Sequence, residues 1–225
     1  MKVYLRTLEN EFRRHGNSVI AKGQKAYMKN HFEFIGLKTP LRRKLQKPFL
    51  EKAALPAKHE LGEIVEVLWH MPEREFQLFA QELVWKYFKK PEKGDIDLLE
   101  YMIVHKSWWD TVDFIAVKLV GNYFWVYPEE IQPYVDKWMA TDNIWLQRTA
   151  LLFQHNYKDK LDTQLLQDMI DRLLGSKEFF INKAIGWILR QYSKTDPKWV
   201  KTFVDNTDLA PLSKKEALKN VDKYK

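Results

Sequence analysis

Four segments of this 225-residue sequence repeat one pattern of apolar and polar positions. In each, apolar residues recur at the 3.6-residue spacing of a helix that buries one side, and each segment ends on a tyrosine. The segments are EFQLFAQELVWKY (75–87), TVDFIAVKLVGNY (111–123), WLQRTALLFQHNY (145–157) and FINKAIGWILRQY (180–192). Their final tyrosines lie 36, 34 and 35 residues apart. The pattern therefore predicts one long helix in each repeat.

Shorter apolar stretches between these segments predict a second helix in each repeat. They cover residues 96–104, 129–139 and 162–174. Two helices in about 35 residues are typical of α-solenoids built from HEAT or related repeats. No strand-like run bounded by hairpin turns competes with this interpretation. The sequence therefore predicts an all-α fold, a curved α-solenoid of HEAT-like repeats with a concave binding cleft, in which residues 1–225 form a single domain.

One polar residue occupies the same position in each long helix, ten residues before the final tyrosine. The four residues are Gln77, Asp113, Gln147 and Asn182. In a stacked array they would align along one face, and solenoids bind their partners on the concave face. Asp113 is the only charged member, and no basic residue lies three or four positions from it on its own helix. We therefore expect Asp113 in the groove rather than in the core.

The composition describes a globular protein, with 45% hydrophobic and 30% charged residues. No window approaches 18 uncharged apolar residues, and the opening MKVYLRTLEN lacks the apolar core of a signal peptide, so a cytoplasmic protein without a membrane span is expected. The absence of cysteine excludes disulfides and Cys-type zinc or iron–sulfur sites. The six histidines show no metal-ligand spacing, and HELGE (59–63) lacks the second histidine of a zincin motif, so no metal is expected.

The net charge of +7 is concentrated near the N-terminus. Residues 1–50 hold twelve Lys and Arg against three Glu, whereas the remainder holds 25 basic and 27 acidic residues. Aromatic residues such as Tyr27, Phe32 and Phe34 are interleaved with these cations. Such a block is typical of a surface that binds a polyanion such as nucleic acid. A solvated cationic face would carry the same charge, so both interpretations stay open.

The helix predicted at 180–192 carries a basic stripe around a tryptophan. Lys183, Trp187, Arg190 and Lys194 are spaced 4, 3 and 4 residues apart and lie on one face, opposite the apolar side. An amphipathic helix normally turns its tryptophan to the apolar side. Here the indole is either covered by the stems of its Lys and Arg neighbours or forms a stacking surface flanked by phosphate contacts.

Arg148 lies among apolar neighbours on its helix, with no carboxylate on the same face. An unpaired buried charge is costly, so its partner must come from elsewhere, either Asp113 one repeat earlier or a ligand phosphate. Trp109 lies four residues before Asp113 on the same side of that helix, whereas Trp108 is turned about 100° toward the buried stripe and is expected in the core. Asp113, Trp109, Arg148 and Trp187 thus form a candidate cluster from three consecutive repeats.

Signatures of nucleophilic or nucleotide chemistry are missing. The sequence contains no GxxxxGK[ST], GxGxxG or GxSxG motif. Ser176 precedes Glu178 by two residues and Ser213 precedes Glu216 by three, and both serines stand where helices are expected to begin. We therefore expect their hydroxyls to cap helices rather than to act as nucleophiles.

With these residues identified, the chain resembles the AlkD-like DNA alkylation repair family, bacterial HEAT-like-repeat alkylpurine DNA glycosylases. The resembling segments span nearly the whole chain and are YMKNHFEFIGLKTPLRR (27–43), LWHMPEREFQ (68–77), KSWWDTVD (106–113), DNIWLQRTA (142–150), SKEFFINKAIGWILRQYSKT (176–195) and LAPLSKKEA (209–217). In that family the catalytic carboxylate matches Asp113, two active-site tryptophans match Trp109 and Trp187, and a cleft arginine matches Arg148.

The resemblance implies hydrolysis of the N-glycosidic bond of purines alkylated at N3 or N7 in duplex DNA. It implies a monofunctional enzyme and a monomer that needs no cofactor and grips the DNA backbone without enclosing the damaged base. The backbone contacts implied by match and charge, with one lysine added from the basic stripe, are Tyr27, Lys29, Thr39, Arg43, Lys183, Arg190 and Lys194. Two alternatives remain: a non-catalytic HEAT-repeat scaffold for an acidic protein, and a DNA-structure-binding protein without chemistry.

Overall fold

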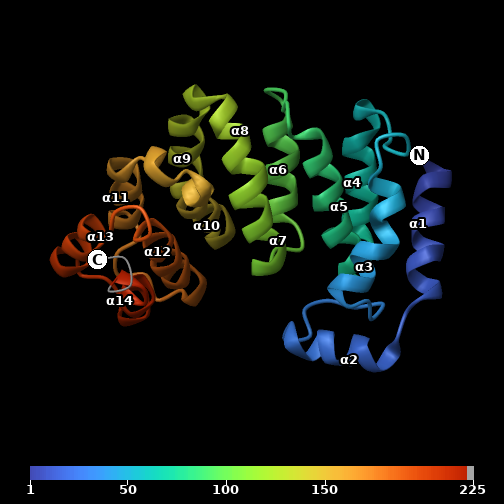
Figure 1. Ribbon diagram of the computed structural model, residues 1–225, viewed down its shortest axis with the longest axis horizontal. Coiled ribbons are helices and arrows are strands. Elements are labelled where there is room, and N and C mark those ends of the chain that lie inside the picture. Colours follow the sequence, from blue (N-terminus) through green and yellow to red (C-terminus); the bar gives the residue numbers. More distant parts are fainter. Residues whose placement is uncertain (222–225) are drawn as a thin grey trace. The chain divides into compact units, whose positions relative to one another are not determined.

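The computed structural model describes residues 1–221, and their regular structure is helical apart from one isolated β-bridge between Glu33 and Glu73. This confirms the predicted all-α class (Figure 1). The chain forms two compact units, residues 1–90 and a second unit that begins at Pro91. No described helix is both long and apolar enough to cross a membrane. A continuous HEAT-like array over the whole chain stays a prediction.

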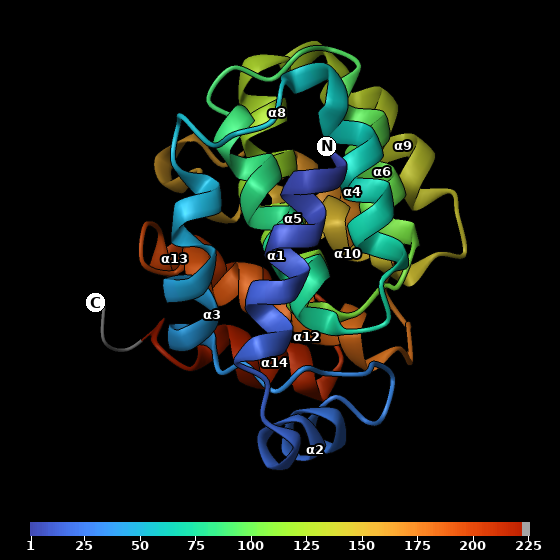
Figure 2. The same cartoon turned by 90° about the vertical axis from the view of Figure 1, so that its right-hand side faces the viewer.

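Buried aromatic rings join the first and last long helices of the first unit. Phe12 of α1 stacks on Phe76 of α5 with ring centroids 5.7 Å apart and meets Phe79 edge-on, and all three rings are fully buried. Figure 2 shows α1 lying across α5. The elements of the unit are α1 (Lys2–Arg14), α2 (Ser18–Tyr27), α3 (Thr39–Gln46), η1 (Lys47–Leu50), η2 (Lys58–Glu60), α4 (Leu61–His70) and α5 (Arg74–Tyr87).

A buried carboxylate fixes the loop between α2 and α3. Glu75 accepts hydrogen bonds from the backbone N–H groups of Ile35, Gly36 and Leu37 at 3.1, 2.9 and 3.0 Å. Gly36 has a φ of +95°, and a Cβ there would lie 2.0 Å from the carbonyl oxygen of Asn17, so only glycine fits. The loop therefore holds α2 and α3 in a fixed relation, and four of the expected DNA contacts lie in or next to these two helices.

The second unit packs its helices in sequence order. Helix α10 contacts α6, α9, η3 and α12, and α12 packs closely on α14. The elements are α6 (Asp95–Val104), α7 (Trp109–Phe114), η3 (Ile115–Val120), α8 (Gly121–Val126), η4 (Pro128–Glu130), α9 (Ile131–Met139), α10 (Ile144–Leu152), η5 (Phe153–Asn156), η6 (Lys158–Lys160), α11 (Thr163–Asp171), α12 (Phe179–Tyr192), α13 (Pro197–Asn206) and α14 (Pro211–Leu218). The helices predicted at 96–104, 129–139 and 180–192 are confirmed.

Two predicted helices depart from regular α-geometry. The helix expected at 111–123 runs from 109 to 126 and contains a π-helical stretch, η3, directly after Asp113 and Phe114. The helix expected at 145–157 ends as α-helix at Leu152 and continues as the 3-10 turn η5. The two irregular regions lie against each other, because a Cβ at Gly121 would lie 2.5 Å from the carbonyl oxygen of Phe153. This close approach of two backbones is set by packing, which a periodic pattern does not report.

The repeated tyrosines have a structural role that explains their spacing. Three of their hydroxyls donate to a backbone carbonyl of an earlier element: Tyr87 to Pro56 at 2.6 Å, Tyr123 to Lys93 at 2.7 Å and Tyr157 to Gly121 at 2.7 Å. Pro56 and Lys93 lie in loops and Gly121 lies at the junction of η3 and α8, so each hydroxyl ties its helix to an earlier part of the chain. The fourth, Tyr192, packs its ring edge-on against Trp199.

Helix α14 approaches α12 through a glycine and a serine. A Cβ at Gly186 would lie 2.4 Å from the Cβ of Glu216 and 2.9 Å from the carbonyl oxygen of Ser213. The Ser213 hydroxyl donates to the carbonyl of Asn182 at 2.8 Å. The prediction that Ser213 caps a helix is therefore wrong, because its hydroxyl joins two helices instead. The Ser176 hydroxyl does accept from the N–H of Glu178, just before α12 begins.

Replacing Gly186 with alanine is expected to lower the free energy of unfolding by about 1–3 kcal/mol, because the added methyl group overpacks the contact between α12 and α14. The control is Gly62→Ala in α4, where nothing lies within 4 Å of the added Cβ. That variant should gain up to about 1 kcal/mol from helix propensity. Denaturant unfolding of both variants measures the difference, and equal gains would contradict the close contact.

Candidate active site

Asp113 and Arg148 form a two-pronged ion pair within the second unit. Nε of Arg148 donates to Oδ1 of Asp113 at 2.7 Å, and Nη2 donates to Oδ2 at 2.9 Å. The Arg148 side chain is only 4% exposed, whereas the Asp113 side chain is 19% exposed. The pair is therefore asymmetric: the guanidinium is buried behind a carboxylate that keeps one side open to solvent.

The remaining nitrogen of Arg148 is also engaged. Nη1 donates to the backbone carbonyl of Phe180 in α12, whose ring lies 5.9 Å from the guanidinium carbon. All three nitrogens thus point at groups of the protein itself. Of the two partners that the sequence left open for Arg148, the structure has Asp113, and the buried guanidinium is not placed to contact a phosphate.

Burial raises the pKa of Asp113 above its ordinary value, and the hydrogen bonds and charge of Arg148 oppose that rise without cancelling it. The charge of Asp110 adds to the rise. Protonating Asp113 would leave the buried Arg148 without a counter-ion, which costs several kcal/mol. The carboxylate therefore stays ionised near neutral pH, while its exposed side is poorly solvated.

The other three polar positions of the long helices show why Asp113 is different. Each side-chain amide donates to the backbone carbonyl six residues earlier, in the loop before its helix: Gln77 to Met71 at 2.9 Å, Gln147 to Thr141 at 2.7 Å and Asn182 to Ser176 at 2.7 Å. Gln77 and Asn182 are buried, so the expectation of an exposed polar row is wrong for them. A carboxylate has no hydrogen to donate, so Asp113 cannot brace its loop in this way. Of these four residues, only Asp113 pairs with an arginine instead of bonding to its own loop.

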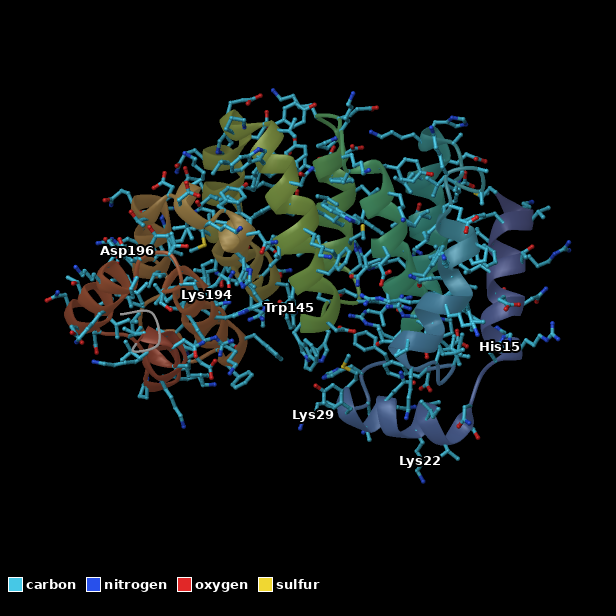
Figure 3. All side chains as sticks on the ribbon, viewed as in Figure 1. His15, Lys22, Lys29, Trp145, Lys194 and Asp196 are labelled. Atoms are coloured by element: carbon cyan, nitrogen blue, oxygen red, sulfur yellow. The ribbon has the colours of Figure 1, made fainter. Side chains whose placement is uncertain are left out.

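The Phe180 ring beside Arg148 belongs to a cluster of aromatic side chains. Trp108, Trp145 and Phe180 pack together, with ring centroids 4.9 to 5.7 Å apart. Trp108 is half-buried, so its expected core position is met only in part. Trp109 begins α7 one turn before Asp113 and is half-buried as well. Trp145, which Figure 3 labels, belongs to the same α10 helix as Arg148.

Trp187 is half-buried on α12, seven residues after Phe180 and on the same face of that helix. Its indole meets the ring of His155 at a centroid distance of 4.5 Å. Two turns of α12, about 10 Å, therefore separate Trp187 from the residue whose carbonyl holds Arg148. Neither Phe180 nor His155 was singled out as a site residue from the sequence, because a backbone carbonyl and a ring contact leave no pattern.

The basic stripe on α12 is organised by a carboxylate from α14. Glu216 is 4% exposed and pairs with Lys183 at 2.8 Å and Arg190 at 2.7 Å, and it also contacts Lys219. Burial alone would raise the pKa of Glu216, but the hydrogen bonds from Lys183 and Lys219 and the charges of Lys183 and Arg190 lower it to about 2. Three cations around one carboxylate leave an excess of positive charge. Lys183 and Arg190 are therefore held in place while the cluster stays cationic.

The low pKa of Glu216 predicts a pH-dependent contribution to stability. Because the pKa is lowered by folding, the contribution is complete above the ordinary value of 4.5 and is lost as the pH falls toward 2. The free energy of unfolding of the wild type should exceed that of Glu216→Gln most near neutral pH, and the gap should shrink in acid. Exposed Glu66→Gln is the control and should show no comparable narrowing. A gap that does not vary with pH would contradict the charge cluster.

Four of the expected DNA contacts lie in the first unit, at the end of α2 and in α3. Tyr27 is 70% exposed, Lys29 follows it with a φ of +56°, and Thr39 is the exposed first residue of α3. Arg43 is 60% exposed, with its Nε 3.4 Å from the carboxylate of Glu82. In the second unit, exposed Lys194 donates to Gln191 at 2.7 Å. Across residues 1–221, no three His, Asp or Glu side chains gather in a way that could hold a metal ion.

Comparison with known proteins gives a consistent result. The family model of the DNA alkylation repair enzymes matches residues 8–221, a range that includes every candidate residue above. The chain is similar to a solved structure described as a predicted DNA alkylation repair enzyme from Enterococcus faecalis, with a TM-score of 0.84 and 33% sequence identity. That similarity covers 91% of this chain and 95% of the other. No curated protein matches the sequence significantly.

Proposed function

The chain belongs to the family of DNA alkylation repair enzymes, and we propose that it is a monofunctional DNA glycosylase of the cytoplasm that acts as a monomer. Its proposed reaction is hydrolysis of the N-glycosidic bond of purines alkylated at N3 or N7 in duplex DNA. The observation that carries the proposal is the partly exposed carboxylate of Asp113, 19% exposed and held by a buried arginine, at the one position where its repeat counterparts carry neutral amides.

The chemistry of the substrate suits a single carboxylate. A purine alkylated at N3 or N7 carries a positive charge and is already a good leaving group. As its bond to the sugar breaks, cationic character develops on the deoxyribose, as in glycoside cleavage generally. Asp113 stabilises that charge and orients the water that attacks the sugar. This assistance suits a labile bond and would not suffice for an undamaged base.

Arg148 serves as a positioning residue rather than a contact to DNA. Its two hydrogen bonds fix both oxygens of Asp113, and its bond to the Phe180 carbonyl ties this orientation to α12. A carboxylate held in advance needs no reorganisation as charge develops. Its open edge is the one that reaches the sugar.

Trp109 and Trp187 supply apolar faces beside the reacting nucleoside. An indole face attracts a cation by about 0.5–2 kcal/mol, so both the charged base and the oxocarbenium-like sugar favour such a surface. The half-exposure of both side chains supports this role. A surface of this kind binds the damaged nucleotide without enclosing its base and would tolerate bulky adducts.

The grip on DNA is assigned to polar and cationic residues of both units, of which Lys183 and Arg190 are half-buried and the others exposed. They are Tyr27, Lys29, Thr39, Arg43, Lys183, Arg190 and Lys194. Each phosphate neutralised by such a group releases counterions, so the logarithm of the affinity should fall with the logarithm of the salt concentration by about 0.9 per contact. A HEAT-like array with a concave cleft is the proposed arrangement of this surface.

The direct test is release of a damaged base. Duplex DNA with a single N7-alkylguanine is incubated with the protein, and free alkylguanine is measured against the spontaneous loss without protein. The proposal predicts base release, an intact strand at the resulting abasic site, and binding that weakens steeply with salt. Salt-sensitive binding without release would favour a DNA-structure-binding protein, and binding that ignores salt would remove DNA as the partner.

A further inference from the structure

A cavity of about 210 Å³ opens in the second unit between the η5–η6 turn and the end of α12. It is lined by Leu161 and by six residues with polar groups: His155, Lys158, Gln191, Tyr192, Lys194 and Thr195. It is distinct from the Asp113–Arg148 pair but reaches the candidate site through His155, whose ring packs on Trp187. Figure 3 labels Lys194 on this side of the unit.

The polar groups of the cavity are suited to an oxyanion. Two lysines line it, Lys158 and Lys194, together with Thr195. Lys194 donates to Oε1 of Gln191, so the polar atom left on that amide is a donor nitrogen. Phosphate oxygens accept hydrogen bonds from all of these groups.

The nearest carboxylates have other partners. Asp196 accepts the backbone N–H of Trp199 at the start of α13 at 2.9 Å, and Asp159 lies 3.9 Å from Lys160 on the exposed surface. Neither of them lines the cavity.

His155 also lines the cavity, so its ring would respond to a charge bound there. Its Nε2 is buried and has no hydrogen-bond partner among the described residues, whereas its Nδ1 lies 3.2 Å from Oδ1 of Asn156. Burial lowers the pKa of His155, and the charges of Lys194 and Arg190 act in the same direction. An anion in the cavity would favour the protonated ring, in which both nitrogens are donors.

The distance along α12 from Trp187 to the cavity limits which phosphate of the DNA could be bound there. Trp187, Gln191 and Lys194 follow one another at 4 and 3 residues on one face of α12. From Trp187 to Lys194 the helix rises by about 10 Å, a reach of roughly three nucleotide steps along one DNA strand. Resting on the proposed function, we infer that this cavity binds one backbone phosphate of the damaged strand, within about three nucleotides of the lesion.

The test pairs a loss of charge on the protein with a loss of charge on the DNA. Duplexes carry a stable abasic analogue and a single neutral methylphosphonate, moved through the three linkages on each side of it. The protein variant is Lys158→Asn, because Lys158 has a φ of +54° and asparagine tolerates that conformation. Lys160→Gln is the matched control, an exposed lysine two residues away that does not line the cavity.

At one linkage, the methylphosphonate should weaken wild-type binding about tenfold but weaken Lys158→Asn little further, since the variant has already lost that contact. Lys160→Gln should respond as the wild type does. If the methylphosphonate weakens binding by the same factor in the wild type and in Lys158→Asn at all six linkages, the phosphate assignment is overturned. Coupling in a protein that releases no alkylated base would instead refute the proposed glycosylase and leave the cavity assignment standing.

A second measurement separates the two sources of phosphate. Nuclear magnetic resonance titration of the His155 ring should give a higher pKa with undamaged duplex than with free protein. It should also show that duplex moves the ring signals at concentrations where inorganic phosphate does not. Signals that respond to inorganic phosphate but not to duplex would make the ligand a free anion and overturn the inference.

Discussion

Replacing Asp113 with asparagine is expected to slow release of an N7-alkylated purine by about a thousandfold under single-turnover conditions, with duplex affinity largely kept. The change removes the charge but preserves the size of the side chain and one acceptor for Arg148. The measured quantity is the first-order rate of base release at saturating protein, after subtraction of spontaneous depurination.

The magnitude follows from the charge that the substitution removes. A carboxylate about 4 Å from the developing positive charge stabilises it by about 4 kcal/mol at an effective dielectric constant of 20. The guanidinium of Arg148 is present in both proteins, so its repulsion of that charge cancels in the comparison. The loss of about 4 kcal/mol corresponds to about a thousandfold in rate.

The comparison needs a protein that stays folded and a matched change of charge. Asp171→Asn, on the exposed surface of α11, is the control for general loss of a negative charge and should release base at the wild-type rate. The circular dichroism of Asp113→Asn should match that of the wild type at the assay temperature. Wild-type rates of release by Asp113→Asn would refute the mechanism proposed for the carboxylate.

The helices were predictable from the sequence wherever one face of the helix is apolar and the opposite face is polar. The stretches 96–104 and 180–192 show clear apolar faces, and both fold as helices within one residue of the predicted ends. The π-helical stretch after Asp113 and the early end of α10 were not predictable, because they depend on the contact of Gly121 with the Phe153 carbonyl in another element. Local periodicity carries no information about that contact.

In the candidate site too, local features were predictable from the sequence and contacts between distant elements were not. The lack of any local partner for Asp113 and Arg148 allowed their pairing to be predicted as one of two options. Glu216 was seen only as part of a helix start, because a sequence does not show that α14 turns this carboxylate onto the basic stripe of α12. The polar character of the four aligned positions also did not distinguish Asp113 from Gln77, Gln147 and Asn182, whose amides donate to loop carbonyls. The decisive difference is the ability to donate a hydrogen bond.

Replacing Arg148 with methionine is expected to lower the free energy of unfolding by about 3–5 kcal/mol, the cost of leaving a partly buried carboxylate without its counter-ion. The melting temperature should fall by roughly 6–20 °C for a chain of this size. Arg172→Met is the matched control, because Arg172 also pairs with a carboxylate at 2.7 Å, that of Asp136, but its side chain is 38% exposed. An exposed pair of this kind contributes about 0–1 kcal/mol. Equal losses in the two variants would contradict the special burial of Arg148.

The double variant Asp113→Asn with Arg148→Met separates positioning from packing. If the loss in Arg148→Met comes from the stranded carboxylate, removing that carboxylate should restore part of the stability, and the double variant should melt above Arg148→Met. The loss in Arg148→Met should also shrink as the pH falls, because burial without the guanidinium raises the pKa of Asp113 further and protonation removes the unpaired charge. A double variant whose loss is the sum of the two single losses, with no dependence on pH, would mean that Arg148 acts through packing. In that case the guanidinium would not be what holds the carboxylate ready for the sugar.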